Sequence, residues 1–173
     1  FRRVLFRSSY FSLDQMVEAA FYCANKLFGL SFQPVSLPLY HKDCKAWEVI
    51  KNGEKIALFI GDYFARSSKR SGAWCSAFQS QAKFPVFQKP IVLNVCNFAK
   101  GSPTLLSFDD AGTLFHEFGH ALHQILSNVT YEPLSGTSVS RDFVELPSQL
   151  FEHWLTVPEV LKRFAVHYKT KSP

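Results

Sequence analysis

Residues 108–126, FDDAGTLFHEFGHALHQIL, carry the clearest helical pattern of the chain and its most distinctive set of polar side chains. Ser107 suits the N-cap position, and Asp109 and Asp110 suit the positive end of the helix dipole. The pattern predicts an amphipathic helix that begins after Ser107 and ends by Asn128. Its apolar residues recur at intervals of three and four, which is typical of one buried face: Ala111, Leu114, Phe115, Phe118, Ala121, Leu122, Ile125 and Leu126.

Within this helix stands the pattern His-Glu-Phe-Gly-His at residues 116–120. Histidines four residues apart project from the same helix face, one turn apart, so His116 and His120 can bind one metal ion together. Glu117 is rotated by about 100° from His116 around the helix axis. It therefore suits a base that acts on a water molecule beside the metal better than a third ligand.

An ordinary pair of surface histidines on an amphipathic helix is the alternative interpretation. The apolar residues count against it, because Phe115 and Phe118 predict that the helix is buried at this point. Gly119 costs a helix about 1 kcal/mol relative to alanine. A close approach of another backbone would explain why glycine stands there.

A catalytic zinc ion is held by three protein ligands, so one more ligand is expected from a neighbouring helix. Glu145 is the preferred candidate, because it follows His120 by enough chain to turn through Gly136 and return antiparallel. Glu132 is a rival in a turn-rich segment. Glu152 is another rival, predicted to lie too far along the next helix.

Two further polar residues near these positions, His123 and Asp142, are not expected to bind the metal themselves. His123 lies on nearly the same helix face as His116, and we expect it to pack or to support a ligand rather than to bind the metal. Asp142 either caps the next helix or orients a ligand histidine, and the sequence leaves both interpretations open. Asp109 and Asp110 are expected to be helix-start residues.

Together these residues favour metal-assisted hydrolysis of a peptide bond. Zinc lowers the pKa of water toward neutrality and polarises the scissile carbonyl group. Glu117 takes the proton of the water and delivers it to the leaving amine. Stabilising the oxyanion needs a further donor, for which Tyr131 and His153 are available without being singled out by their spacing.

The rest of the chain predicts an α+β fold. Periodicity predicts an N-terminal helix over residues 12–30, followed by an extended connector around Pro34 and Pro38. A further helix is expected over residues 142–155, with Pro147 in its first turn or at a kink. Between them lies a small, mainly antiparallel sheet, with strands expected at 46–51, 55–60, 73–78 and 91–95 and a hairpin turn at Asn52-Gly53.

Composition excludes several classes of protein. The 173 residues, 47% apolar and 19% charged, predict one globular domain without a membrane span. The net charge of +5 lies largely at the two ends of the chain, so a nucleic-acid partner is not expected. Residues 1–11 are interpreted as a non-native or disordered leader. Four widely spaced cysteines predict reduced, mostly buried thiols in a cytoplasmic protein: Cys23, Cys44, Cys75 and Cys96.

Several segments are similar to the M3 family of zinc metallopeptidases, which includes thimet oligopeptidase and oligopeptidase A. They are HEFGHALH at 116–123, RDFVELPSQLFEHW at 141–154, GDYFARSSKRSGAW at 61–74 and NVCNF at 94–98. LSGT at 134–137 and RDFVE at 141–145 point to the bacterial peptidyl-dipeptidase branch. The resemblance spans about residues 13–167, so we interpret residues 12–173 as part of an M3-type catalytic domain.

This resemblance implies a zincin-like core with one zinc ion held by His116, His120 and Glu145, and Glu117 as the catalytic glutamate, in agreement with the spacing. Members of the family are longer, with a helical portion before this region and a later Gly- and Tyr-rich segment. That later segment contacts the substrate and stabilises the oxyanion. The resemblance also implies cleavage of short peptides and, for this branch, release of dipeptides from a free C-terminus.

The expected function is therefore a zinc-dependent peptidyl-dipeptidase whose partners are short peptides, with no nucleic acid and no membrane. One alternative is an endo-acting oligopeptidase of the same family, and another is a metal-binding chain without turnover. Lys69 or Arg70 could grip the terminal carboxylate of a substrate, but a solvated loop is the preferred interpretation of that segment.

Overall fold

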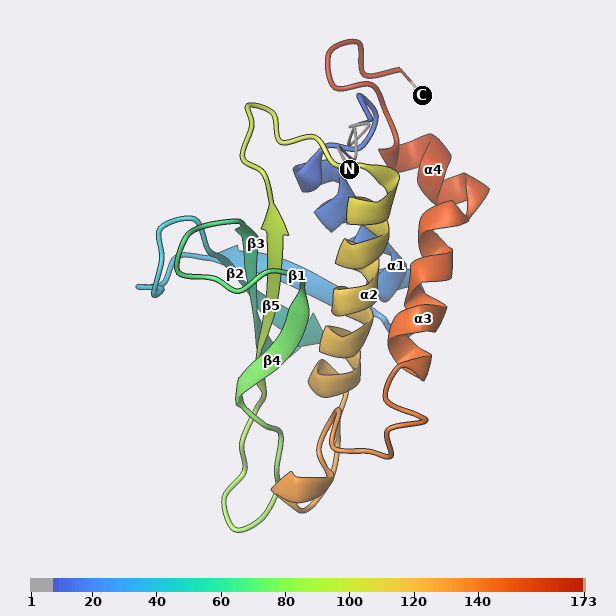
Figure 1. Cartoon of the computed structure of the whole chain (residues 1–173). Helices are drawn as coiled ribbons and strands as arrows, with labels where there is room; N and C mark the ends of the chain where they lie inside the picture. Colours follow the sequence, from blue (N-terminus) through green and yellow to red (C-terminus); the bar gives the residue numbers. More distant parts are fainter. Residues whose placement is uncertain (1–7, 173) are drawn as a thin grey trace.

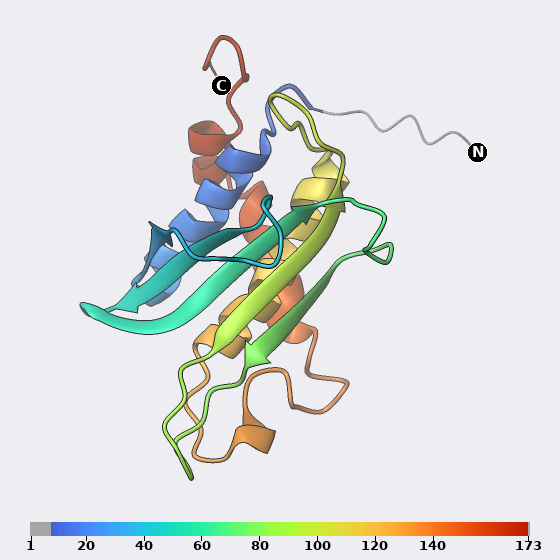
Figure 2. The same ribbon diagram turned by 90° about the vertical axis from the view of Figure 1, so that its left-hand side faces the viewer.

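The computed structural model describes residues 8–172 and has an α+β architecture, in which helices pack on one face of a five-stranded sheet (Figure 1, Figure 2). Across these residues, no helix combines the length and the apolar character needed to cross a membrane. The elements follow in this order: α1 (Leu13–Phe28), β1 (Leu30–Val35), β2 (Lys45–Lys51), β3 (Glu54–Phe64), β4 (Trp74–Gln79), β5 (Ile91–Phe98), α2 (Phe108–Ile125), η1 (Glu132–Leu134), α3 (Leu146–Glu152), η2 (His153–Thr156) and α4 (Pro158–Phe164).

The predicted leader lies largely outside the described residues, which begin at Ser8. Its remaining part pairs with the segment that precedes α2, since Ser8 N–H donates to the Leu106 carbonyl and Leu106 N–H donates to the Phe11 carbonyl. The extent of a leader stays a prediction.

The sheet has the strand order β1-β2-β3-β5-β4. Three of these pairings are antiparallel, as predicted, whereas β3 and β5 run parallel because β5 is inserted between β3 and β4. The β2–β3 hairpin turns at Asn52 and Gly53, whose φ angles of 53° and 81° suit this dipeptide. One prediction is wrong: the connector after α1 is strand β1. Pro34 is tolerated there because an edge strand leaves one row of N–H positions unpaired.

Helix α2 begins as the sequence predicts. The Ser107 hydroxyl accepts a hydrogen bond from Asp110 N–H, and the Asp110 carboxylate accepts one from Ser107 N–H, which together form a capping box. The helix predicted over 142–155 is shorter than expected. It begins at Leu146 because Pro147 fits only the first turn, and residues 153–156 continue it as a 3₁₀ turn.

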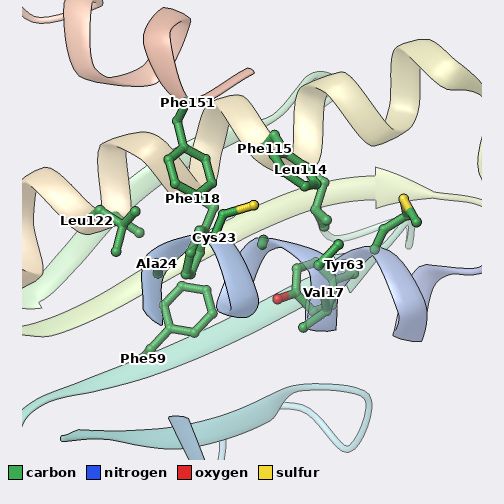
Figure 3. Close-up of a cluster of buried hydrophobic side chains, with 14 of the residues drawn as sticks. Val17, Cys23, Ala24, Phe59, Tyr63, Leu114, Phe115, Phe118, Leu122 and Phe151 are labelled. Carbon is green, nitrogen blue, oxygen red and sulfur yellow. The ribbon is translucent and has the colours of Figure 1, made fainter. Parts of the chain in front are cut away.

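The core lies between α1, α2 and the sheet, and Phe118 of α2 stands near its centre (Figure 3). The Phe118 ring centroid lies 5.5 Å from that of Phe21 on α1, 5.2 Å from that of Phe59 on β3 and 5.6 Å from that of Phe151 on α3. Burying each such ring contributes roughly 1.5–3 kcal/mol. The helix that carries the two histidines is therefore fixed by apolar packing on several sides.

The cysteines are unpaired, and three of the four are buried. Burial raises the pKa of Cys23 to about 11. Burial likewise raises the pKa of Cys75 and of Cys96, with the Glu117 carboxylate as the next cause. The prediction of mostly buried thiols is confirmed.

Asp62 on β3 is the centre of a buried ion network that corrects the expectation for Lys69. The Lys69 side chain is only 4% exposed, and its ammonium donates to the Asp62 carboxylate and to the carbonyls of Phe64 and Cys96. Arg66 donates to both Asp62 carboxylate oxygens at 2.7 Å. Lys69 is therefore neither a solvated loop residue nor a free cation that could grip a substrate.

We expect Asp62→Asn to destabilise the protein by about 3–5 kcal/mol at neutral pH, because it leaves the buried Lys69 ammonium without a counter-charge. Burial alone would raise the pKa of Asp62, but hydrogen bonds from Arg66, Tyr40 and Lys69 outweigh it and lower the pKa to about 2. This stabilisation is present above the unfolded pKa of 3.8 and is lost as the pH falls toward 2. Urea unfolding at pH 7 and pH 3 should show a smaller difference between wild type and variant at pH 3, and an equal difference would contradict the assignment.

Candidate metal centre

Helix α2 presents His116 and His120 on one face, one turn apart, with their ring centroids 4.9 Å apart. The Nε2 atom of each ring lies 3.1 Å from the same atom, Oε2 of Glu145. All three donor atoms fall within 4.8 Å of one another. The structure thus brings together the two histidines and the carboxylate that the sequence singled out.

Glu145 reaches the histidines because it stands directly before α3, at the N-cap position. The hydroxyl of Ser148, which is fully buried, lies 3.0 Å from Glu145 Oε2 and 2.8 Å from the Glu145 carbonyl oxygen, so it restrains both side chain and backbone. A Cβ atom built on Gly119 would lie 2.6 Å from Ser148 Cα. The predicted close approach of another backbone at Gly119 is confirmed, and the approaching backbone belongs to α3, the helix that Glu145 directly precedes.

The environment of the centre favours an ionised Glu145 carboxylate beside a neutral His120 imidazole. Burial acts to raise the pKa of Glu145, but the Ser148 hydrogen bond and the two histidines lower it overall. Burial lowers the pKa of His120. Metal ligands must be deprotonated, so this electrostatic environment prepares the groups for a cation.

Glu117 lies outside the group of three converging donors and is buried, with 7% of its surface exposed. Burial raises the pKa of its carboxyl group, the neighbouring His116 lowers it, and Glu145 raises it further, for a net increase. A raised pKa makes a carboxylate a better proton acceptor near neutral pH. The role of Glu117 as the base stays a prediction.

The types and separations of the three donor atoms suit a zinc ion. Two imidazole nitrogens and a carboxylate oxygen are ligands that zinc accepts, and tetrahedral bonds of 2.0–2.1 Å place neighbouring donors about 3.3 Å apart. The two nitrogen–oxygen distances of 3.1 Å are close to this value. The residues present therefore fit a zinc ion.

Neither rival ligand belongs to the group of three donors, but one of them makes a contact that was not predicted. Glu132 is exposed in the short 3₁₀ helix η1, away from the donor group. Glu152 was expected to lie too far along the helix, but its Oε1 contacts Nδ1 of His116. Sequence reasoning missed this contact because it weighed Glu152 only as a metal ligand, whereas the carboxylate reaches the other ring nitrogen, Nδ1.

The supporting residues take simpler positions. His123 packs edge-on against Phe143, and its Nδ1 is buried without a hydrogen-bond partner within residues 8–172. Asp142 cannot be the helix cap, because α3 begins four residues later and Glu145 precedes it.

The two candidates for stabilising the oxyanion lie at other positions. Tyr131 precedes η1 and packs against Phe84, while His153 follows α3 directly. Within residues 8–172, no hydrogen bond joins Tyr131 or His153 to the three donors.

A sequence model of peptidase family M3 matches residues 5–173. The chain belongs to this family. The match confirms the resemblance drawn from the HEFGH and RDFVE segments, and it extends over almost the whole chain.

Curated members of the family show how the chain relates to longer proteins. The dipeptidyl carboxypeptidase of Escherichia coli (strain K12) is 47% identical over 167 residues, which are 93% of this chain and 24% of that protein. Oligopeptidase A of the same organism is 36% identical over 172 residues, 95% of this chain and 25% of the relative. The thimet-like oligopeptidase of Dictyostelium discoideum is 37% identical, with 94% and 26% covered. The chain spans about a quarter of the length of these relatives.

Proposed function

We propose that residues 12–173 form part of a zincin-like catalytic domain that binds one zinc ion and hydrolyses short peptides, releasing dipeptides from a free C-terminus. One observation carries the proposal: both histidine Nε2 atoms and one carboxylate oxygen converge, with each nitrogen 3.1 Å from that oxygen. Membership of peptidase family M3 supports hydrolysis of peptides. The higher identity to a dipeptidyl carboxypeptidase than to oligopeptidase A, 47% against 36%, supports dipeptide release.

Each residue of the site has a distinct part in this mechanism. When bound, zinc supplies Lewis-acid chemistry that acidifies water and polarises a carbonyl group. His116, His120 and Glu145 hold the ion. Glu117 accepts a proton from a water molecule at its carboxylate oxygen and passes that proton to the nitrogen of the leaving amine. The apolar packing of α2 keeps Glu117 and the two histidines in fixed relative positions.

The free edge of the sheet supports a peptide as the substrate. Strand β4 is an edge strand and, within the described residues, pairs only with β5. Helix α2 packs against β4, and the Glu117 carboxylate is close enough to Cys75 on β4 to raise the pKa of that thiol, after burial. An extended peptide added to this edge would lie beside the proposed base.

We expect the zinc-loaded chain to bind one zinc ion and to release dipeptides from short peptides with a free C-terminal carboxylate. Removing the metal with a chelator should abolish hydrolysis, and adding zinc should restore it, because the ion is what acidifies the water and polarises the carbonyl group. Metal analysis gives the stoichiometry, and mass spectrometry identifies the products. Failure to take up zinc would overturn the proposal.

Peptides amidated at the C-terminus provide the matched control. A dipeptide-releasing enzyme should leave them intact, whereas an endo-acting oligopeptidase, the first alternative, should still cut them. Zinc uptake without hydrolysis of either peptide would favour the second alternative, a metal-binding chain without turnover. The observation that favours this second alternative is that the chain spans only about a quarter of the length of the relatives.

A further inference from the structure

We propose that Glu152 is a positioning residue whose carboxylate holds the His116 ring with Nε2 toward the metal centre. This inference rests on the proposed function, because it concerns the same site. Glu152 is the last residue of α3, and Glu145 stands directly before the first. The short helix therefore brings one carboxylate to each of the two nitrogen atoms of the same imidazole ring.

The contacts of the His116 ring decide which of its two nitrogen atoms carries the proton. Nε2 of His116 faces Oε2 of Glu145 at 3.1 Å, and Nδ1 hydrogen-bonds Oε1 of Glu152. A nitrogen that binds a metal must offer its lone pair, so the ring proton belongs on Nδ1. The Glu152 carboxylate accepts a hydrogen bond from that N–H and so selects the tautomer and the ring orientation that metal binding needs.

The two histidines differ in how they are held. The Nδ1 atom of His120 is buried and has no hydrogen-bond partner within residues 8–172. The His120 side chain is 11% exposed and the His116 side chain is 25% exposed. Packing can restrain His120, whereas the more exposed His116 depends on its hydrogen bond. The hydrogen bond from His116 Nδ1 to Glu152 thus restrains the ring of His116 from outside the group of three donors.

A purely stabilising ion pair is the competing explanation of the contact. The Glu152 side chain is 43% exposed, and an exposed pair contributes only about 0–1 kcal/mol to stability. On that explanation, removing the carboxylate would slightly lower the melting temperature and would leave the tautomer of His116 unchanged. The two explanations therefore differ in a property that can be measured directly.

Zinc affinity is the first measurement, by competition with a chromophoric chelator. Glu152→Ala should raise the Kd for zinc about 10–100-fold, because the ring loses its restraint. Glu152→Gln should have a smaller effect, because the amide oxygen still accepts the Nδ1 hydrogen bond. Glu132→Ala is the matched control, since Glu132 is exposed and lies outside the donor group, and its Kd should equal that of the wild type.

The tautomer of His116 is the second measurement and needs no metal. Nitrogen-15 NMR of the zinc-free chain, at a pH where the ring is neutral, should show the proton on Nδ1 in the wild type and in Glu152→Gln. A mixture of both tautomers is expected in Glu152→Ala. An unchanged tautomer together with an unchanged Kd in folded Glu152→Ala would overturn the inference. If the wild type binds no zinc but the tautomer shifts, the proposed function is wrong and the positioning role stands.

Discussion

Replacing Glu117 with glutamine is expected to reduce peptide hydrolysis by the zinc-loaded chain about 10²–10⁴-fold and to leave zinc affinity unchanged. Glutamine keeps the shape of the side chain but cannot accept the proton of the attacking water. Glu117 lies outside the three converging donors, so the metal centre should remain intact. The kcat/KM for a short peptide with a free C-terminus and the zinc content of the variant together test this expectation.

Glu132→Gln serves as the control for the same chemical change at an exposed position, and its kcat/KM should match that of the wild type. Glu145→Gln should instead lose zinc, because it removes the charge of a proposed ligand. Retention of most of the hydrolysis by Glu117→Gln would show that another group accepts the proton, and the mechanism proposed for this buried carboxylate would be wrong.

The parts of the site that lie within one helix could be predicted from the sequence because their geometry is local. Spacing alone places His116 and His120 on one face of α2 and rotates Glu117 away from them, and the Ser107 cap fixes where the helix begins. The glycine at position 119 also predicted a contact with a second segment of the chain. A residue that weakens a helix without an evident reason indicates a neighbour, and the neighbour is α3.

The parts that depend on the docking of separate segments could not be derived in the same way. The contact of Glu152 with His116 depends on how α3 packs against α2, and α3 begins four residues later than the periodicity predicts. The parallel pairing of β3 with β5 depends on the insertion of β5, which no local pattern records. Lys69 stands in a polar segment of the sequence, but its side chain is buried because its ammonium pairs with the buried Asp62 carboxylate.

Both groups of residues meet at the interface between α2 and α3. The histidines belong to α2, whereas Glu145, Ser148 and Glu152 belong to α3 or stand directly before it. The separation of the two helices therefore decides whether the donor atoms converge. Gly119 controls that separation, because Ser148 Cα, Phe151 Cβ and the Pro147 carbonyl oxygen would all lie within 3.0 Å of an added Cβ.

We expect Gly119→Ala to lower the free energy of unfolding by about 2 kcal/mol or more, although alanine favours a helix over glycine by about 1 kcal/mol. Overpacking costs about 1–3 kcal/mol in a well-packed core, and the upper end applies here because a contact with backbone cannot be relieved by rotating a side chain. If α3 moves away instead, Glu145 moves with it, and zinc affinity should fall at least about tenfold, which corresponds to about 1.4 kcal/mol.

Gly112→Ala is the matched control, because Gly112 lies on the same helix and an added Cβ there would meet nothing within 4 Å. That variant should gain up to about 1 kcal/mol from helix propensity and keep its zinc affinity. Urea unfolding of the zinc-free variants and chelator competition separate the two effects. Equal stability and equal zinc affinity of the two variants would mean that close packing of α3 on Gly119 does not hold the carboxylate against the histidines, since propensity acts alike at both positions and only the contact distinguishes them.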